Sequence, residues 1–184
     1  MKRLGLLLLV LLGFSTGAVA GADDLRVTPQ QAYDRVQAEG DELLFIDVRD
    51  PVEIMFVGST DEVHANIPFR LVDRTHWNAE AGVFAMPKNP DFAAEVEAAL
   101  AERGLDRDAT VITMCRSGSD RGRPSAEYLR EAGFSNALYV ENGFQGDPIE
   151  AGERAGMRLQ NGWQNSGLPW SREINPEKIY RPGD

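Results

Sequence analysis

Cysteine is nearly missing from this chain: among its 184 residues there is one, Cys115. A single cysteine cannot form an internal disulfide, and it excludes an internal dithiol oxidoreductase, because that chemistry needs a second thiol. Histidine is scarce as well: His64 and His76 are the two in the chain, they are far apart in the sequence, and a surface or packed role is expected for each in preference to that of a base. No cluster has metal-site spacing and no glycine-rich nucleotide loop follows a strand, so we expect neither a metal nor another cofactor.

Positive charge is also in short supply. The chain has 19 Lys and Arg residues against 29 Asp and Glu, which gives a formal net charge of −10. Such a chain repels polyanions, which argues against nucleic acid and anionic membrane surfaces as partners. A site for a small anion must therefore be local, built from backbone amides and one or two arginines.

The apolar stretch at the N-terminus, residues 4–14, is too short to span a bilayer comfortably. It follows the basic pair Lys2 and Arg3 and precedes Ala18-Val19-Ala20, and this order is typical of a signal peptide with its cleavage site. We therefore predict a signal peptide over residues 1–20 and a periplasmic or secreted protein. An uncleaved membrane anchor is the alternative hypothesis.

Cleavage would leave a mature chain that begins at Gly21. Its 164 residues are enough for one domain with a sizeable core, and the loss of Lys2 and Arg3 makes the formal charge −12. We predict a single domain over residues 21–184, with its core in about 25–170 and a C-terminal tail. No contact with the membrane is expected after cleavage.

Helical and strand patterns alternate along the mature chain. Helices are predicted over 29–38, 50–57, 89–103 and 124–132, and strands over 43–48, 62–69, 110–114 and 137–140. Residues 73–88 and those beyond Gly143 show no clear period, although Trp163 and Trp170 are expected to pack the tail against the body. Alternation of this kind predicts an α/β fold with a mostly parallel sheet, in which ligands bind at the carboxyl ends of strands.

Cys115 stands at such a strand end. The uncharged run Thr110–Met114, which is rich in β-branched residues, leads directly to it. A small polar loop follows, and then Pro124, which suits the first turn of a helix. Amides that converge in such a loop stabilise a thiolate and bind anions, so we predict that Cys115 is a nucleophile. The alternative is a buried structural cysteine at a strand end.

The whole loop after the cysteine is predicted to bind substrate: Arg116, Ser117, Gly118, Ser119, Asp120 and Arg121. Guanidinium groups match oxyanions with paired donors, and Arg121 is the better candidate for this role by its position. The competing hypothesis for Arg121 is an ion pair with Asp120 or Glu127.

Two charged residues at the end of the neighbouring predicted strand, Asp47 and Arg49, are expected to support the site. They would do so either as an ion pair that ties loop to helix or by contact with substrate. The next helix begins with Asp50 as its N-cap, and Glu53 stands at the capping-box position.

An ordered set of motifs resembles a rhodanese homology domain over about residues 25–170. The set comprises Ile46-Asp47-Val48-Arg49-Asp50-Pro51 with Glu53, Asn66-Ile67-Pro68, Cys115-Arg116-Ser117-Gly118, Ser125-Ala126 with Leu129, Gly133-Phe134, and Gly162-Trp163 with Gly167-Leu168-Pro169. The resemblance implies a central parallel five-stranded sheet with helices on both faces. It also implies a sulfurtransferase, in which the cysteine takes a sulfane sulfur from thiosulfate or a persulfide donor and passes it to cyanide, an external thiol or a sulfur-carrier protein.

The loop is longer than is usual in that family, because Arg121 stands six positions after Cys115. The spacing Cys-x5-Arg resembles the cell-division-cycle dual-specificity phosphatases and the eukaryotic arsenate reductases. A longer loop has room for a tetrahedral oxyanion, so a cysteine-dependent phosphatase or arsenate reductase is one alternative function. A non-catalytic, thiol-bearing module that binds a sulfur carrier or redox partner is another.

Overall fold

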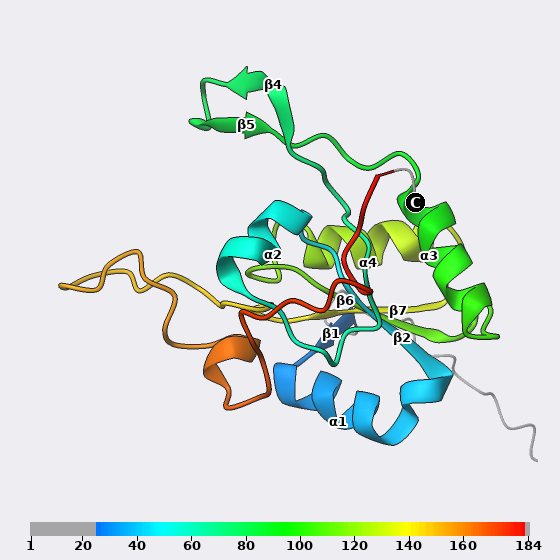
Figure 1. Cartoon of the computed structure of the whole chain (residues 1–184). Coiled ribbons are helices and arrows are strands. Elements are labelled where there is room, and N and C mark those ends of the chain that lie inside the picture. The colour runs from blue at the N-terminus through cyan, green and yellow to red at the C-terminus, as the bar shows by residue number, and fades with distance from the viewer. Residues whose placement is uncertain (1–24, 183–184) are drawn as a thin grey trace, which may run out of the picture.

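The computed structural model describes residues 25–182 and is built around one parallel sheet (Figure 1). Five strands lie in the order β1-β7-β6-β2-β3, and every neighbouring pair is parallel. Their bounds are Arg26–Val27 for β1, Leu43–Asp47 for β2, Ala65–Asn66 for β3, Thr110–Met114 for β6 and Asn136–Val140 for β7. The signal peptide predicted for residues 1–20 lies outside the described residues.

Helices cover both faces of this sheet. Their bounds are Pro29–Glu39 for α1, Pro51–Val57 for α2, Phe92–Glu102 for α3 and Gly122–Glu131 for α4, with short 3-10 turns at Gly40–Glu42 (η2) and Trp163–Asn165 (η3). Figure 1 shows α1 on one face and α3 and α4 on the other. The α/β fold with a five-stranded parallel sheet and helices on both faces is thus confirmed. None of the described helices has the length and apolar character to cross a membrane.

The central strands are continuous apolar runs because both of their faces are buried. In β2, Leu43 and Phe45 join the cluster on the α1 side, whereas Leu44 and Ile46 join the cluster beneath α3 and α4. Trp163 completes the α1 side: its side chain is wholly buried, and its ring centroid lies 5.5 Å from that of Phe45. The expectation that the tail packs against the body is therefore met by Trp163.

Two stretches differ from the sequence-based expectation. The strand predicted over residues 62–69 shrinks to β3, because its ladder to β2 is irregular: the N–H groups that donate to Phe45 and Asp47 are those of His64 and Ile67, three residues apart. On its outer side the Asn66 N–H donates to the Lys178 carbonyl at 2.7 Å. The aperiodic stretch 73–88 contains an antiparallel hairpin of β4 (Asp73–Asn78) and β5 (Val83–Ala85). This hairpin is largely exposed on both sides, so no alternation of apolar and polar residues marks it.

His64 lies beside β2, with its ring bound to that strand. Its Nδ1 accepts a hydrogen bond from the Phe45 N–H at 2.9 Å, which requires an unprotonated nitrogen. Burial, followed by the charges of Arg103 and Lys178 and against the opposing charge of Asp41, lowers the pKa of His64 from 6.5 to about 4. The folded protein therefore holds this ring neutral at a pH where the unfolded chain protonates it.

We expect His64 to make the fold sensitive to mild acid. Because its folded pKa lies below its unfolded value, stability is greatest above pH 6.5 and is lost as the pH falls towards 4. The loss is of order 1–2 kcal/mol after allowance for the partly exposed ring. In His64→Asn, an amide oxygen can replace Nδ1 as acceptor without titrating, so thermal melts over this range should show a flatter dependence on pH. His76→Asn, on the exposed hairpin, is the control; an equally flat profile for both variants would contradict the assignment.

Candidate active site

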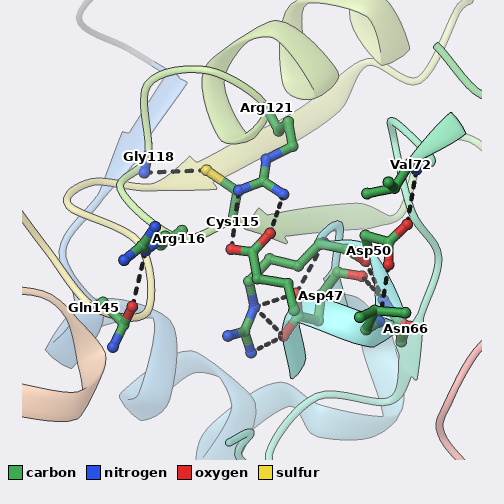
Figure 2. Close-up of polar contacts among 12 residues, drawn as sticks. Asp47, Asp50, Asn66, Val72, Cys115, Arg116, Gly118, Arg121 and Gln145 are labelled. Carbon is green, nitrogen blue, oxygen red and sulfur yellow. Dashed lines mark hydrogen bonds and ion pairs between the residues drawn. The ribbon is translucent and has the colours of Figure 1, made fainter. Parts of the chain in front are cut away.

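Cys115 follows β6, the middle strand of the sheet, and lies at its carboxyl edge. Its side chain is fully buried, and its Sγ accepts a hydrogen bond from the Gly118 N–H at 3.2 Å (Figure 2). Helix α4 begins at Gly122, so close to the sulfur that a Cβ on this residue would lie 3.4 Å from Sγ. A backbone donor and a helix N-terminus therefore face the one thiol, an arrangement that stabilises a thiolate.

The shape of the cysteine loop depends on two glycines whose backbones lie in close contact. Gly118 has a φ of +83° and Gly143 a φ of +53°, a region that L side chains rarely adopt. A Cβ on Gly118 would lie 2.8 Å from the Asn142 nitrogen, and a Cβ on Gly143 would lie 2.8 Å from the Gly118 nitrogen. The cysteine loop and the turn after β7 can approach this closely only without side chains between them.

Arg121 is paired with α2 across the mouth of the site. Its Nη1 and Nη2 donate to the Glu53 carboxylate at 2.5 and 3.1 Å, and the two side chains are 10 and 19% exposed. Burial opposes the charged form of Arg121, but the hydrogen bonds and charge of Glu53, with the nearby Cys115 and Asp47, raise its pKa. Arg121 is thus a fixed positive charge next to the sulfur.

This pair corrects two sequence-based expectations. An ion pair of Arg121 was considered with Asp120 or Glu127, each close in sequence, yet the partner is Glu53, 68 positions away. Glu53 itself was placed in a capping box, whereas its carboxylate binds Arg121 and the α2 cap consists of Asp50 alone, whose side chain accepts from the Val52 N–H. Spacing along the sequence predicts contacts between residues one helical turn apart, but it does not predict contacts between residues that are distant in the sequence.

Asp47 and Arg49 form a fully buried ion pair at the end of β2, the strand next to β6. Arg49 donates to both carboxylate oxygens of Asp47 and to the Gly58 carbonyl, and its guanidinium lies 4.3 Å from the Phe144 ring centroid. One nitrogen of the group, Nη1, has no hydrogen-bond partner among the described residues. Of the two roles considered for these residues, the ion pair that ties loop to helix is the one their contacts match.

Of the remaining loop residues, Arg116, Ser119 and Asp120 are exposed and Ser117 is half-buried. Ser117 and Ser119 share a hydroxyl hydrogen bond of 2.9 Å, and Ser119 also contacts Asp120 at 3.3 Å. Arg116 donates from Nε to the Gln145 side chain at 2.9 Å. These residues surround the mouth of the loop and are therefore placed to meet a substrate that enters from solvent.

Two residues near the cysteine loop were not among the site residues predicted from the sequence. Gln145 binds Arg116, and Arg158 donates to the Gly146 carbonyl, one residue further along. Both belong to the region after β7, where glycine and polar residues interrupt every periodic pattern. No motif there indicates which side chains return to the cysteine loop.

Comparison with known proteins agrees with this geometry. The pattern of the rhodanese-like domain family matches residues 28–147, a range that includes the whole loop. The structure is similar to the crystal structure of Rv0390 from M. tuberculosis, with 30% sequence identity, coverage of 80% of this chain and 96% of that one, and a TM-score of 0.58. The comparison with curated proteins gave no match.

Two further structures are more distant. A rhodanese-related protein of Thermoplasma volcanium shares 21% identity, over 80% of this chain and 98% of that one, with a TM-score of 0.44. A polysulfide-sulfur transferase of Wolinella succinogenes, a 30 kDa homodimer, shares 28% identity over 67 and 72% of the two chains, with a TM-score of 0.40.

Proposed function

Because this chain belongs to the rhodanese-like domain family, we propose that it is a sulfurtransferase that carries a sulfane sulfur on Cys115. The observation that supports this most is the position of its one cysteine, buried at the carboxyl edge of the sheet with the Gly118 N–H on its sulfur. Parallel α/β sheets bind their ligands at this edge. A thiolate held there is a nucleophile with a donor already aimed at its charge.

In the first half of the proposed reaction, the Cys115 thiolate attacks the outer sulfur of thiosulfate. A sulfur–sulfur bond to Sγ forms, the bond between the two thiosulfate sulfurs breaks, and its electron pair leaves with sulfite. In the second half, cyanide or a thiolate attacks the terminal sulfur of the Cys115 persulfide and leaves as thiocyanate or a persulfide. The cysteine returns as a thiolate, so the cycle needs no outside oxidant or reductant.

The described residues have separate parts in this cycle. The Gly118 N–H and the N-terminus of α4 stabilise negative charge on the sulfur in both its forms. Arg121 supplies a positive charge near the sulfur, which favours the approach of an anionic donor. With one cysteine in the chain, no second thiol within it can collect the sulfur, so the acceptor must be a separate molecule: cyanide, an external thiol or a sulfur-carrier protein.

Phosphatase chemistry is the hypothesis to test against this one. Arg121 uses two of its five N–H donors on Glu53, so its remaining donors could meet either a sulfonate or a phosphate. The family match is what favours sulfur transfer over phosphoryl transfer.

Mass spectrometry of the purified protein tests the proposal. Treatment with thiosulfate should add one sulfur atom to the peptide containing Cys115, and cyanide should then remove it with formation of thiocyanate. A protein that gains no sulfur but hydrolyses a small aryl phosphate or reduces arsenate would overturn the proposal in favour of the Cys-x5-Arg chemistry. A protein inactive in all three assays would be a thiol-bearing binding module instead.

A further inference from the structure

Residues 147–161, which we call the extension, leave the sheet after β7 and return to it before η3. Figure 1 shows them in yellow to orange as a narrow loop that projects away from the sheet. The loop is closed by hydrogen bonds across it: the Ile149 N–H donates to the Met157 carbonyl at 2.8 Å, and the Asp147 N–H donates to the Asn161 side chain at 2.7 Å. The extension therefore has a defined course and holds its side chains in place.

The base of the extension is bound to the residue that follows the nucleophile. The Arg116 carbonyl accepts hydrogen bonds from the N–H groups of Gln145 and Gly146, at 2.8 and 3.2 Å. Arg158, from the far side of the extension, donates through Nη1 to the carbonyl of the same Gly146. Arg116 and Arg158 are thus held at one residue of the turn, next to the cysteine loop.

The two guanidinium groups bind neighbouring residues of the turn, Arg116 the Gln145 side chain and Arg158 the Gly146 carbonyl. Partial burial and then the charge of Arg158 lower the pKa of Arg116, against the opposing charge of Glu53. Among residues 25–182, the ion pairs are Arg49–Asp47, His76–Asp73, Arg107–Glu97, Arg121–Glu53 and Arg123–Glu127. Neither Arg116 nor Arg158 takes part in one.

Two adjacent unpaired arginines are unusual in a chain with ten more acidic than basic residues. The extension itself carries three carboxylates, of which Glu150 and Glu153 are exposed and Asp147 accepts hydrogen bonds from the side-chain amides of Asn142 and Asn161. None of the three forms an ion pair with Arg116 or Arg158 among the described residues. Like charges held near one another without an ion pair to either make a local positive field that attracts an anion, at some cost to stability.

We propose that Arg158 and Arg116 bind the oxyanion end of a substrate of the Cys115 reaction and so determine its specificity. The bound group is the sulfonate of the sulfur donor or the carboxylate of the acceptor thiol; both offer oxygens that match guanidinium donors. This inference rests on the proposed sulfurtransferase function, since it assigns the substrate class of that same site. Arg121, which is already paired with Glu53, remains the charge nearer the sulfur.

The test is substitution of Arg158 with a matched control on the same extension. Arg158→Gln removes the charge, Arg158→Lys keeps the charge but not the paired donors, and Arg154→Gln removes an exposed arginine four positions earlier. Each variant is assayed with thiosulfate as donor and with either mercaptopropionate or mercaptoethanol as acceptor. These two acceptors are similar in size and differ in charge.

We expect Arg158→Gln to lower kcat/KM about ten- to a hundredfold, mainly through KM, with partial recovery in Arg158→Lys. A rise in the KM for thiosulfate with both acceptors would assign the site to the donor. A loss confined to mercaptopropionate would assign it to the acceptor. Arg154→Gln should change each constant less than about twofold, and an equal effect of the Arg154 and Arg158 substitutions would overturn the inference.

Equilibrium binding separates this inference from the proposed function. Thiosulfate and mercaptopropionate are titrated calorimetrically onto Cys115→Ser, with and without Arg158→Gln, so no turnover is needed. Weaker binding of either probe in the double variant supports the anion site even if the wild-type protein forms no persulfide. Persulfide formation together with binding that does not depend on Arg158 would refute the inference and leave the sulfurtransferase proposal standing.

Discussion

Replacing Cys115 with serine is expected to abolish sulfur transfer and leave the fold intact. A serine oxygen cannot form the persulfide on which the cycle depends, so the loss should be complete rather than partial. The substitution is nearly isosteric at a fully buried position, and the Gly118 N–H that meets Sγ can donate to the hydroxyl instead. The change in unfolding free energy should therefore stay within about 1–2 kcal/mol.

Thiocyanate production from thiosulfate and cyanide measures the activity, and circular dichroism with a thermal melt measures the fold. Cys115→Ala is the companion variant, because it removes the polar atom as well and leaves the Gly118 N–H without its acceptor. Both variants should lack turnover, with Cys115→Ala the less stable of the two. Turnover near the wild-type level in either one would show that the cysteine is structural.

Arg121→Ala should have the next largest effect, on activity and on stability together. It removes the positive charge nearest the sulfur and leaves the largely buried Glu53 carboxylate unpaired beside the thiolate. We expect about a ten- to over a hundredfold loss in kcat/KM for thiosulfate. Leaving a buried charge without its partner costs about 3 kcal/mol in folding stability, the lower end of the range because both side chains are slightly exposed.

A double-mutant cycle with Glu53→Gln separates the two causes. If the unpaired carboxylate contributes much of the damage, the double variant should be more stable and more active than Arg121→Ala alone. Arg121→Lys should lie between wild type and Arg121→Ala, since it keeps the charge and loses the paired donation to Glu53. Wild-type kinetics in Arg121→Ala would mean that the pair only joins the loop to α2, and that Arg116 and Arg158 alone receive the anion.

Elements with strong local signals were predictable from the sequence. Helix α1 has a Thr28 cap followed by Pro29, and its observed capping box between Thr28 and Gln31 fixes the predicted start. Strand β6 is a β-branched run buried on both faces, and its bounds match the prediction. In each case the chain's own neighbours determine the conformation, so short-range patterns are sufficient.

Elements that depend on distant partners were not predictable. Strand β1 has two residues and exists because Arg26 and Val27 align with Tyr139 and Val140 of β7. The exposed hairpin of β4 and β5 has no buried face to leave a period in the sequence. A strand shows a recognisable apolar pattern in the sequence only where at least one of its faces is buried. Hydrogen-bond pairing alone produces no such pattern.

The candidate site divides in the same way. The cysteine at a strand end, the polar loop after it and the neighbouring Asp47 and Arg49 follow from position along the chain. Glu53 binds Arg121 of the loop, and Arg158 binds Gly146, whose N–H donates to the Arg116 carbonyl. Their partners could be assigned only once the sheet had brought those segments together.

The contact between Gly118 and Gly143 limits which relatives can keep this loop. Any side chain at either position would have to occupy the space of the opposite backbone, so both positions must remain glycine even where the surrounding residues change. A homologue that retains the cysteine but carries a larger residue at either position would have lost the loop geometry. The presence of glycine at both positions is therefore a criterion, separate from the presence of the cysteine, for recognising homologues that keep the geometry of this loop.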